Sequence, residues 1–248
     1  MAYMIQWVRS LIFNFTMYLA LFVIGVLFFP WAMFSRHGAL RACKTYAHWV
    51  RWSARWMIGL KTEIRGTPPT GEVMIGAKHQ SFLDIIVIFS VVPAGKFIMK
   101  RELLWAPILG QYARWIGCVP VNRGKRGAAI LQMVADVASG AQEPGQLIIY
   151  SQGTRVAPGV KKPYKIGTYA LYKDLNQPCV PVATNIGVFW PRHGVYRKPG
   201  VAVVDFLEPI PTGMQSKAFM RQLEDVVETR SDALMREAGF DPDGTIRQ

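Results

Sequence analysis

The chain has 248 residues, of which 51% are hydrophobic, and its formal net charge is +13 at pH 7. This apolar content excludes intrinsic disorder, in which high net charge accompanies few apolar residues. The length suits one α/β domain with appendages. A basic chain this rich in apolar residues is expected to meet nucleic acid or an anionic membrane surface.

The N-terminal segment favours the membrane. Residues 11–34 contain no charged side chain, and about 20 apolar residues suffice to cross a bilayer core. The segment lacks an early basic region and a small-residue cleavage site, so we do not expect a cleaved signal peptide. Pro30 and Trp31 near its end predict a kink at the interface. The sequence leaves open whether the segment spans the membrane or returns as a hairpin with the next helix.

The next segment combines tryptophans with cations. Trp49, Trp52 and Trp56 recur at helical spacing, accompanied by Arg41, Lys44, Arg51 and Arg55. Aromatic rings at headgroup depth, beside cations that meet anionic lipid, indicate an interfacial helix. The alternative is an amphipathic helix packed on the rest of the protein. Because cations follow the apolar run and only Arg9 precedes it, the positive-inside rule predicts a cytoplasmic body. We therefore expect a membrane anchor at residues 1–60 and one domain at 61–248.

The remainder alternates between strand-like and helix-like patterns. Strands are expected at residues 62–65, 73–77, 97–99, 118–121, 147–150, 180–183 and 201–204. Helices are expected at 84–91, 107–116, 127–139, 166–173 and 216–238. This alternation predicts an α/β fold with a mostly parallel sheet flanked by helices on both faces. An N-terminal membrane-anchoring pair of helices would precede it.

His79 and Asp84 stand where the second predicted strand gives way to a helix. On one continuous helix, residues five apart point about 140° away from each other. The two side chains meet only if His79 lies in the loop and Asp84 in the first helical turn. The carboxylate then takes the proton of one ring nitrogen and leaves the other as a base for a hydroxyl. Taken alone, the pair also fits a polar loop residue and a charge at a helix start.

Three cations follow other predicted strands. Lys100 follows the strand at 97–99, Arg123 follows 118–121, and Arg155 ends the segment Tyr150-Ser151-Gln152-Gly153-Thr154-Arg155. Each one alone fits a solvated surface charge. Together they indicate a phosphate site beside His79, because the carboxyl ends of parallel strands share one edge and arginine binds phosphate bidentately.

These blocks resemble the glycerophospholipid acyltransferase family, most closely the bacterial 1-acylglycerol-3-phosphate acyltransferases. The family pattern Asn-His-x4-Asp corresponds to Lys78 through Asp84, and Phe-Pro-Glu-Gly-Thr-Arg corresponds to residues 150–155. A basic residue after a Phe-Ile-like strand corresponds to Lys100. The Gly-x5-Arg block corresponds to residues 117–123, and the Val-Pro-Val block to 180–182. The likeness covers about residues 70–185, and the N-terminal helices also look like the anchor of bacterial members.

The chain departs from this pattern twice. Lys78 replaces the usual asparagine and adds a cation beside the histidine, whereas Gln152 replaces the usual glutamate and removes a carboxylate. Glutamine keeps an acceptor oxygen and adds N–H donors. A positioning role of residue 152 can therefore survive the change, but a role of its charge cannot.

The resemblance implies transfer of an acyl group from a thioester to the 2-hydroxyl of lysophosphatidic acid, which forms phosphatidic acid in phospholipid biosynthesis. His79 and Asp84 would be catalytic. The acceptor would be bound by Lys100, Arg123, Gln152, Gly153, Thr154 and Arg155, with backbone amides near Gly153 supporting the oxyanion. No cofactor or metal is expected, and acyl-CoA or acyl carrier protein would be the donor. The expected partners are membrane lipid and these substrates, not nucleic acid, at the cytoplasmic side of a bacterial inner membrane.

Two other functions remain open, namely acylation of a different lysolipid, such as a lyso-ornithine lipid or lysophospholipid, and non-catalytic lipid binding. The basic residues 161–165 are expected to dock an acidic carrier or to contact anionic lipid. Cys43, Cys118 and Cys179 show no metal-type spacing, and Cys118 and Cys179 are expected to be core thiols.

Overall fold

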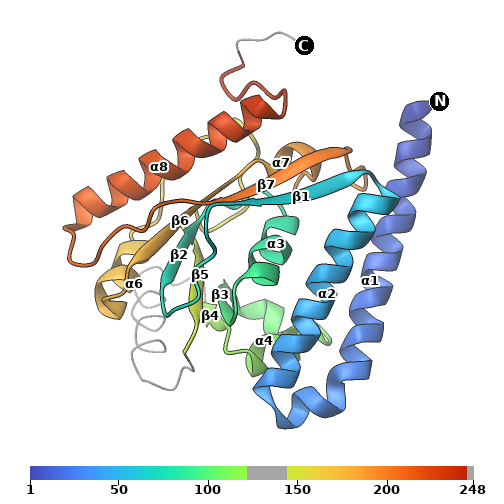
Figure 1. Ribbon diagram of the computed structural model, residues 1–248, viewed down its shortest axis with the longest axis horizontal. Helices are drawn as coiled ribbons and strands as arrows, with labels where there is room; N and C mark the ends of the chain where they lie inside the picture. Colours follow the sequence, from blue (N-terminus) through green and yellow to red (C-terminus); the bar gives the residue numbers. More distant parts are fainter. Residues whose placement is uncertain (122–143, 245–248) are drawn as a thin grey trace.

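The computed structural model describes residues 1–121 and 144–244, and its order of elements confirms the α/β prediction (Figure 1). The strands are β1 (Leu60–Arg65), β2 (Met74–Ala77), β3 (Gly95–Lys100), β4 (Val119–Val121), β5 (Gln146–Tyr150), β6 (Cys179–Thr184) and β7 (Gly200–Phe206). The helices are α1 (Ala2–Phe34), α2 (Arg36–Met57), α3 (Leu83–Val91), η1 (Arg101–Trp105), α4 (Leu109–Trp115), α6 (Gly167–Leu175), α7 (Ile186–Phe189) and α8 (Ser216–Glu237). The helix expected at 127–139 and Arg123 lie outside the described residues.

The seven strands form one sheet in the order β1-β7-β6-β2-β5-β3-β4. Neighbouring strands are parallel except for β6 and β7, which pair antiparallel. The sheet is therefore mostly parallel, as predicted. β2 lies between β6 and β5 and is buried along its whole length, which explains why its sequence is a continuous apolar run. The carboxyl end of β2 therefore lies at the middle of the sheet, between neighbouring strands.

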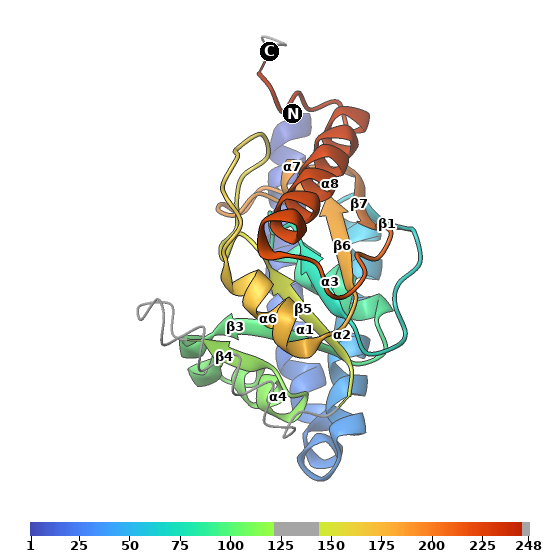
Figure 2. The same ribbon diagram turned by 90° about the vertical axis from the view of Figure 1, so that its left-hand side faces the viewer.

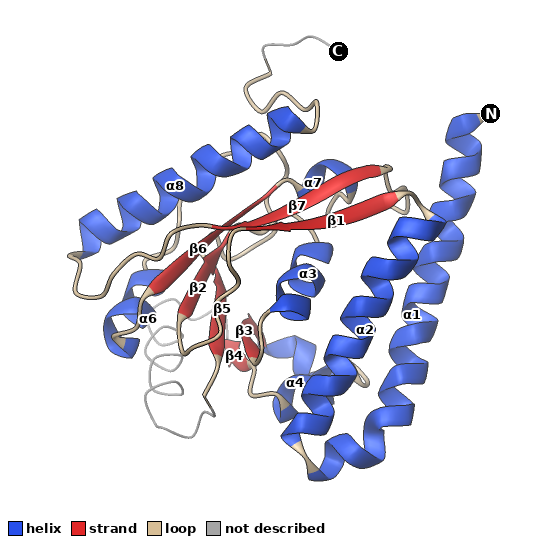
Figure 3. Ribbon diagram, in the orientation of Figure 1, coloured by secondary structure: helices blue, strands red, loops and turns tan. Residues whose placement is uncertain are grey.

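Helices cover the two faces of the sheet in separate layers (Figures 2 and 3). α6 and α8 lie on one face, and α1 to α4 lie on the other. Alternate residues of β2 belong to different cores. Met74 packs with Leu223 of α8, whereas Ile75 and Ala77 pack with the cluster that contains α2 and α3. This period of two fixes the face toward which each residue beyond the strand end points.

The N-terminal helices form a hairpin joined at Ser35. Pro30 lies inside α1, and the helix continues through it to Phe34, so the structure extends the helix past the position of the predicted kink. The polar start of α1 is fixed to the body, because Gln6 donates hydrogen bonds to the carbonyls of Ile58 and Arg197. Within the described residues, α1 is the helix long and apolar enough to cross a membrane, and only 17% of its most apolar window is buried.

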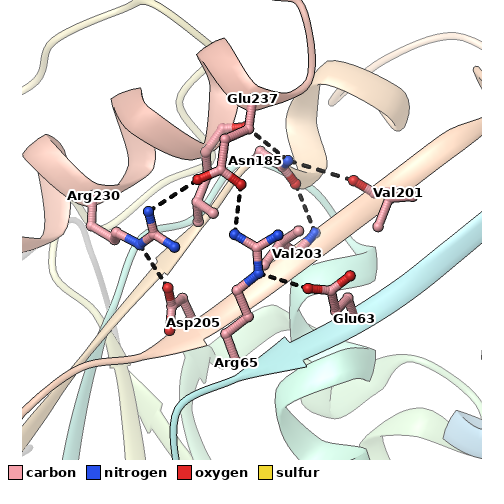
Figure 4. Close-up of polar contacts among 9 residues, drawn as sticks. Glu63, Arg65, Asn185, Val201, Val203, Asp205, Arg230 and Glu237 are labelled. Carbon is pink, nitrogen blue, oxygen red and sulfur yellow. Dashed lines mark hydrogen bonds and ion pairs between the residues drawn. The ribbon is translucent and has the colours of Figure 1, made fainter.

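A charged network attaches the C-terminal half of α8 to β7 and to the edge strand β1 (Figure 4). Arg230 donates to Asp205 of β7 at 2.7 Å and to Glu237 at 3.1 Å. Arg65 of β1 bridges Glu237 and Glu63 at 2.6 Å each. The hydrogen bond that Glu237 accepts from Arg65 lowers the pKa of the Glu237 carboxyl. α8 is therefore held at one end independently of the strands at the centre of the sheet.

Candidate active site

His79 lies in the loop after β2, and Asp84 lies in the first turn of α3. His79 Nδ1 and Asp84 Oδ1 are 2.9 Å apart, as the five-residue spacing predicts. Asp84 is fully buried, and its other oxygen accepts the backbone N–H groups of Gln80 at 2.8 Å and Ser81 at 2.9 Å. Three N–H donors match the acceptor-only chemistry of an ionised carboxylate. The loop is thus folded around Asp84, which fixes the imidazole.

The imidazole is packed on an aromatic wall and still reaches solvent. Its ring stacks on that of Tyr150 with centroids 3.9 Å apart, and Phe97 stacks behind Tyr150 at 6.2 Å. The His79 side chain is 12% exposed. Because Nδ1–H is donated to Asp84, Nε2 carries the free lone pair. Burial, followed by the negative charge of Asp84, raises the pKa of Tyr150 well above its ordinary value, so this ring stays a neutral phenol. The arrangement suits a general base.

The segment after β5 is bonded to this loop, because the backbone N–H of Val156 donates to the carbonyl of His79 at 2.8 Å. Gly153 has φ +70°, a conformation that favours glycine, and its N–H donates to the carbonyl of Tyr150 at 2.8 Å. The Gly153 amide itself is therefore already bonded, and the oxyanion role expected of backbone amides near Gly153 stays a prediction. Gln152 is buried and donates to the carbonyl of Lys162 at 3.2 Å. Thr154 is partly buried. The acceptor-binding roles of Gln152, Gly153 and Thr154 stay predictions.

Arg155 has a cationic neighbour that the sequence does not indicate. Its guanidinium donates to the carbonyl of Arg192 at 3.4 Å, and that of Arg192 donates to the carbonyl of Arg155 at 3.4 Å. Both bonds end on backbone oxygens, so each fork keeps further N–H donors for an anion. An open pocket of about 470 Å³ is lined by residues that include Pro158, Pro191 and His193, which are close to these arginines in the sequence.

Two other cations that the sequence singles out have acidic partners. Lys100 ends β3, two strands from β2 in the sheet, and its exposed ammonium contacts Glu102 at 3.2 Å. Lys78 is buried and paired with Glu228 of α8. That partner lies 150 positions away along the chain, and no local sequence signal identifies it. Lys100 and Arg123 stay predicted phosphate ligands.

The cysteines are core thiols. Burial raises the pKa of Cys43 and of Cys179 to about 12, and that of Cys118 to about 11. Thiolate is the nucleophilic form of cysteine, so these residues are unsuited to covalent catalysis. In the described ranges, no three His, Cys, Asp or Glu residues are grouped so that they could hold a metal ion.

A histidine base oriented by a buried aspartate, at the end of a central strand, defines an α/β enzyme that activates a hydroxyl. The chain belongs to the acyltransferase family, whose model matches residues 61–185. It is 26% identical over 205 residues to a 1-acyl-sn-glycerol-3-phosphate acyltransferase of Pseudomonas aeruginosa, with 81% of this chain and 79% of that protein covered.

A second relative with the same name, from Limnanthes alba, is 29% identical over 194 residues, with 77% of this chain and 67% of that protein covered. The crystal structure of the 1-acyl-sn-glycerophosphate (LPA) acyltransferase PlsC from Thermotoga maritima superimposes with a TM-score of 0.78. That match covers 94% of this chain and 99% of the other at 18% identity. It shows that the two proteins share the fold.

Proposed function

We propose that the protein transfers a fatty acyl group from an acyl thioester to the 2-hydroxyl of 1-acylglycerol-3-phosphate and so forms phosphatidic acid. The observation that carries this proposal is the His79–Asp84 pair, with Nδ1 bonded to a fully buried carboxylate and Nε2 free. The relatives named as 1-acyl-sn-glycerol-3-phosphate acyltransferases support the choice of acceptor.

The chemistry needs one base. Nε2 of His79 takes the proton of the acceptor hydroxyl while the oxygen attacks the thioester carbonyl, and Asp84 stabilises the imidazolium that forms. The C–O bond forms as the C–S bond breaks, and the proton on His79 passes to the departing thiolate. No covalent intermediate on the enzyme is required. The donor is acyl-CoA or acyl carrier protein, and the reaction as written uses no cofactor and no metal.

Arg155 and Arg192 are proposed to bind the acceptor phosphate. Each guanidinium is bonded to the backbone of the other arginine, and a planar guanidinium can bind phosphate oxygens bidentately. Lys100 and Arg123 are proposed as further ligands. In the basic segment at 161–165, Tyr164 is buried against α8, whereas Lys161 and Lys165 remain exposed. Those two lysines are proposed to meet the acidic donor.

The hairpin of α1 and α2 is proposed to lie in one leaflet, on the cytoplasmic side of a bacterial inner membrane. α1 exposes large apolar side chains, among them Phe15, Phe22 and Leu27. α2 packs beside it and carries five cations, Arg36, Arg41, Lys44, Arg51 and Arg55. Each cation costs about 2.5–3.5 kcal/mol at a bilayer centre. An orientation in the membrane plane buries the apolar face of α1 and leaves these cations at the headgroups.

The proposal is tested by adding the purified full-length protein to vesicles with radiolabelled acyl-CoA or acyl carrier protein and a panel of lysolipids. The panel contains lysophosphatidate, lysophosphatidylcholine and a lyso-ornithine lipid. We expect lysophosphatidate to be the preferred acceptor, and His79→Ala to lower the rate roughly 10²–10⁴-fold. Preference for another lysolipid would refute the choice of acceptor. Absence of transfer to every acceptor, with a folded protein, would refute the enzymatic function.

A further inference from the structure

The residues on both sides of His79 in sequence are attached to α8. Gln80 contacts the sulfur of Met235 through Nε2 at 3.5 Å, and Lys78 forms an ion pair with Glu228. Glu228 and Met235 are seven residues apart, which places them on one face of the helix. Because side chains alternate beyond β2, His79 points away from α8, toward Asp84 and Tyr150. The helix thus holds the strand end from behind the catalytic side chain.

The ion pair is partly buried and includes a third group. Lys78 is 2% exposed, Glu228 is 18% exposed, and the hydroxyl of Tyr164 donates to the other Glu228 oxygen at 2.9 Å. Burial, and then Glu228, raises the pKa of Tyr164 well above its ordinary value, so Tyr164 remains a proton donor. Glu224 and Asp232 face the same ammonium from adjacent turns. Burial raises the pKa of both carboxyls, and the charge of Lys78 opposes that rise.

α8 is a firm support for this contact. Leu223 lies against Gly76 of β2 so closely that a Cβ there would meet it at 3.0 Å. The far half of the helix is held by the bonds from Arg230 and Arg65 (Figure 4). Removal of the Lys78–Glu228 pair therefore leaves α8 attached. If only the glutamate is removed, the Lys78 ammonium stays inside the protein, which is a costly state for a buried charge.

We propose that Lys78 and Glu228 are positioning residues for the acyl transfer, because their ion pair fixes the end of β2 and thereby sets the orientation of His79. Glu228 lies outside residues 61–185, which the family model matches. The lysine that departs from the family pattern at position 78 is thus balanced by a carboxylate on the C-terminal helix, not by residue 152, whose side chain contacts Lys162.

The experiment compares Glu228→Gln, Lys78→Asn and the double variant in the full-length protein. Glu228→Gln removes the carboxylate that forms the ion pair with the 2% exposed Lys78 ammonium, and we expect kcat to fall about tenfold or more, because small misplacements of a catalytic group are costly. The KM values for both substrates should change less than about twofold, since the pair lies behind the base. Lys78→Asn should have the smaller effect, because Tyr164 still donates to Glu228. The double variant contains neither charge of the pair and should regain most of the lost kcat.

A matched control separates positioning from stability. Asp205→Asn breaks the 2.7 Å bond from Arg230 and so weakens another attachment of α8. We expect it to lower the melting temperature without changing kcat. Glu228→Asp keeps the carboxylate on a shorter side chain and should retain more kcat than Glu228→Gln. It serves as the test variant if Glu228→Gln does not fold.

A second readout does not depend on enzymatic activity. The inference rests on the proposed function only where kcat and KM are measured. Hydrogen exchange is measured in a peptide that covers residues 78–84, where the amides of Gln80 and Ser81 bond to Asp84. We expect faster exchange in Glu228→Gln and recovery in the double variant. Unchanged exchange in Glu228→Gln, or a double variant that sums the two single effects on kcat, would overturn the positioning role. An inactive wild type with the expected exchange pattern would instead count against the proposed function alone.

Discussion

Asp84→Asn tests how the dyad is oriented. Asp84 accepts three hydrogen bonds, two from backbone N–H groups through Oδ2 and one from His79 through Oδ1. An asparagine has one acceptor oxygen. If that oxygen keeps both backbone donors, its NH2 group faces Nδ1 and forces the imidazole into the tautomer with the proton on Nε2. If the amide flips, two buried N–H groups face a donor and lose bonds to a charged group worth about 1.5–3 kcal/mol each.

The first arrangement should therefore prevail, and Nε2 would no longer be a base. We expect kcat to fall roughly 10²–10⁴-fold, with little change in KM for either substrate. Initial rates of acyl transfer, measured over a range of pH on vesicles, provide the assay. Asp225→Asn makes the same isosteric change on the exposed side of α8, where Asp225 is 66% exposed, and should be neutral. A kcat within about tenfold of wild type, with the fold intact, would refute the tautomer argument.

Three further predictions follow from the same structure. Arg155→Ala and Arg192→Ala should each raise KM for lysophosphatidate by roughly 10–150-fold, which corresponds to one charged bidentate contact of about 1.5–3 kcal/mol. The control Arg221→Ala, at an exposed position, should leave KM unchanged. An unchanged KM in either test variant places that arginine outside the phosphate site. Leu27→Glu should weaken flotation with anionic vesicles, whereas Val160→Glu, at an exposed apolar position outside α1, should not; equal flotation of both would contradict the proposed membrane face. Glu237→Gln should lower the melting temperature at pH 7, because the folded pKa of Glu237 is lowered by Arg65. That contribution is complete above the ordinary glutamate pKa of 4.5 and is lost as the pH falls through the lower folded value, so the difference from wild type should shrink below pH 4.5; a difference that is constant with pH would rule out the ionic origin.

The sequence by itself determined the parts of the protein that depend on short-range pattern. Continuous apolar runs marked the buried central strands, such as β2, because a strand covered on both faces tolerates few polar side chains. The spacing of His79 and Asp84 predicted their meeting, because five residues across a loop and the first turn of a helix bring these two side chains together. The uncharged N-terminal run likewise gave the exposed apolar helix α1.

Tertiary structure alone decided which distant groups face these residues. Gln152 turned away into the fold, the direction of β7 became antiparallel to β6, and Arg192 came to lie against Arg155. Lys78 pairs with Glu228, 150 positions away, on the face of the sheet opposite to the one that His79 occupies. Periodicity states which face a side chain occupies, but the element covering that face follows from strand order and helix packing. Those are set by burial of the whole core, and no short stretch of sequence encodes them.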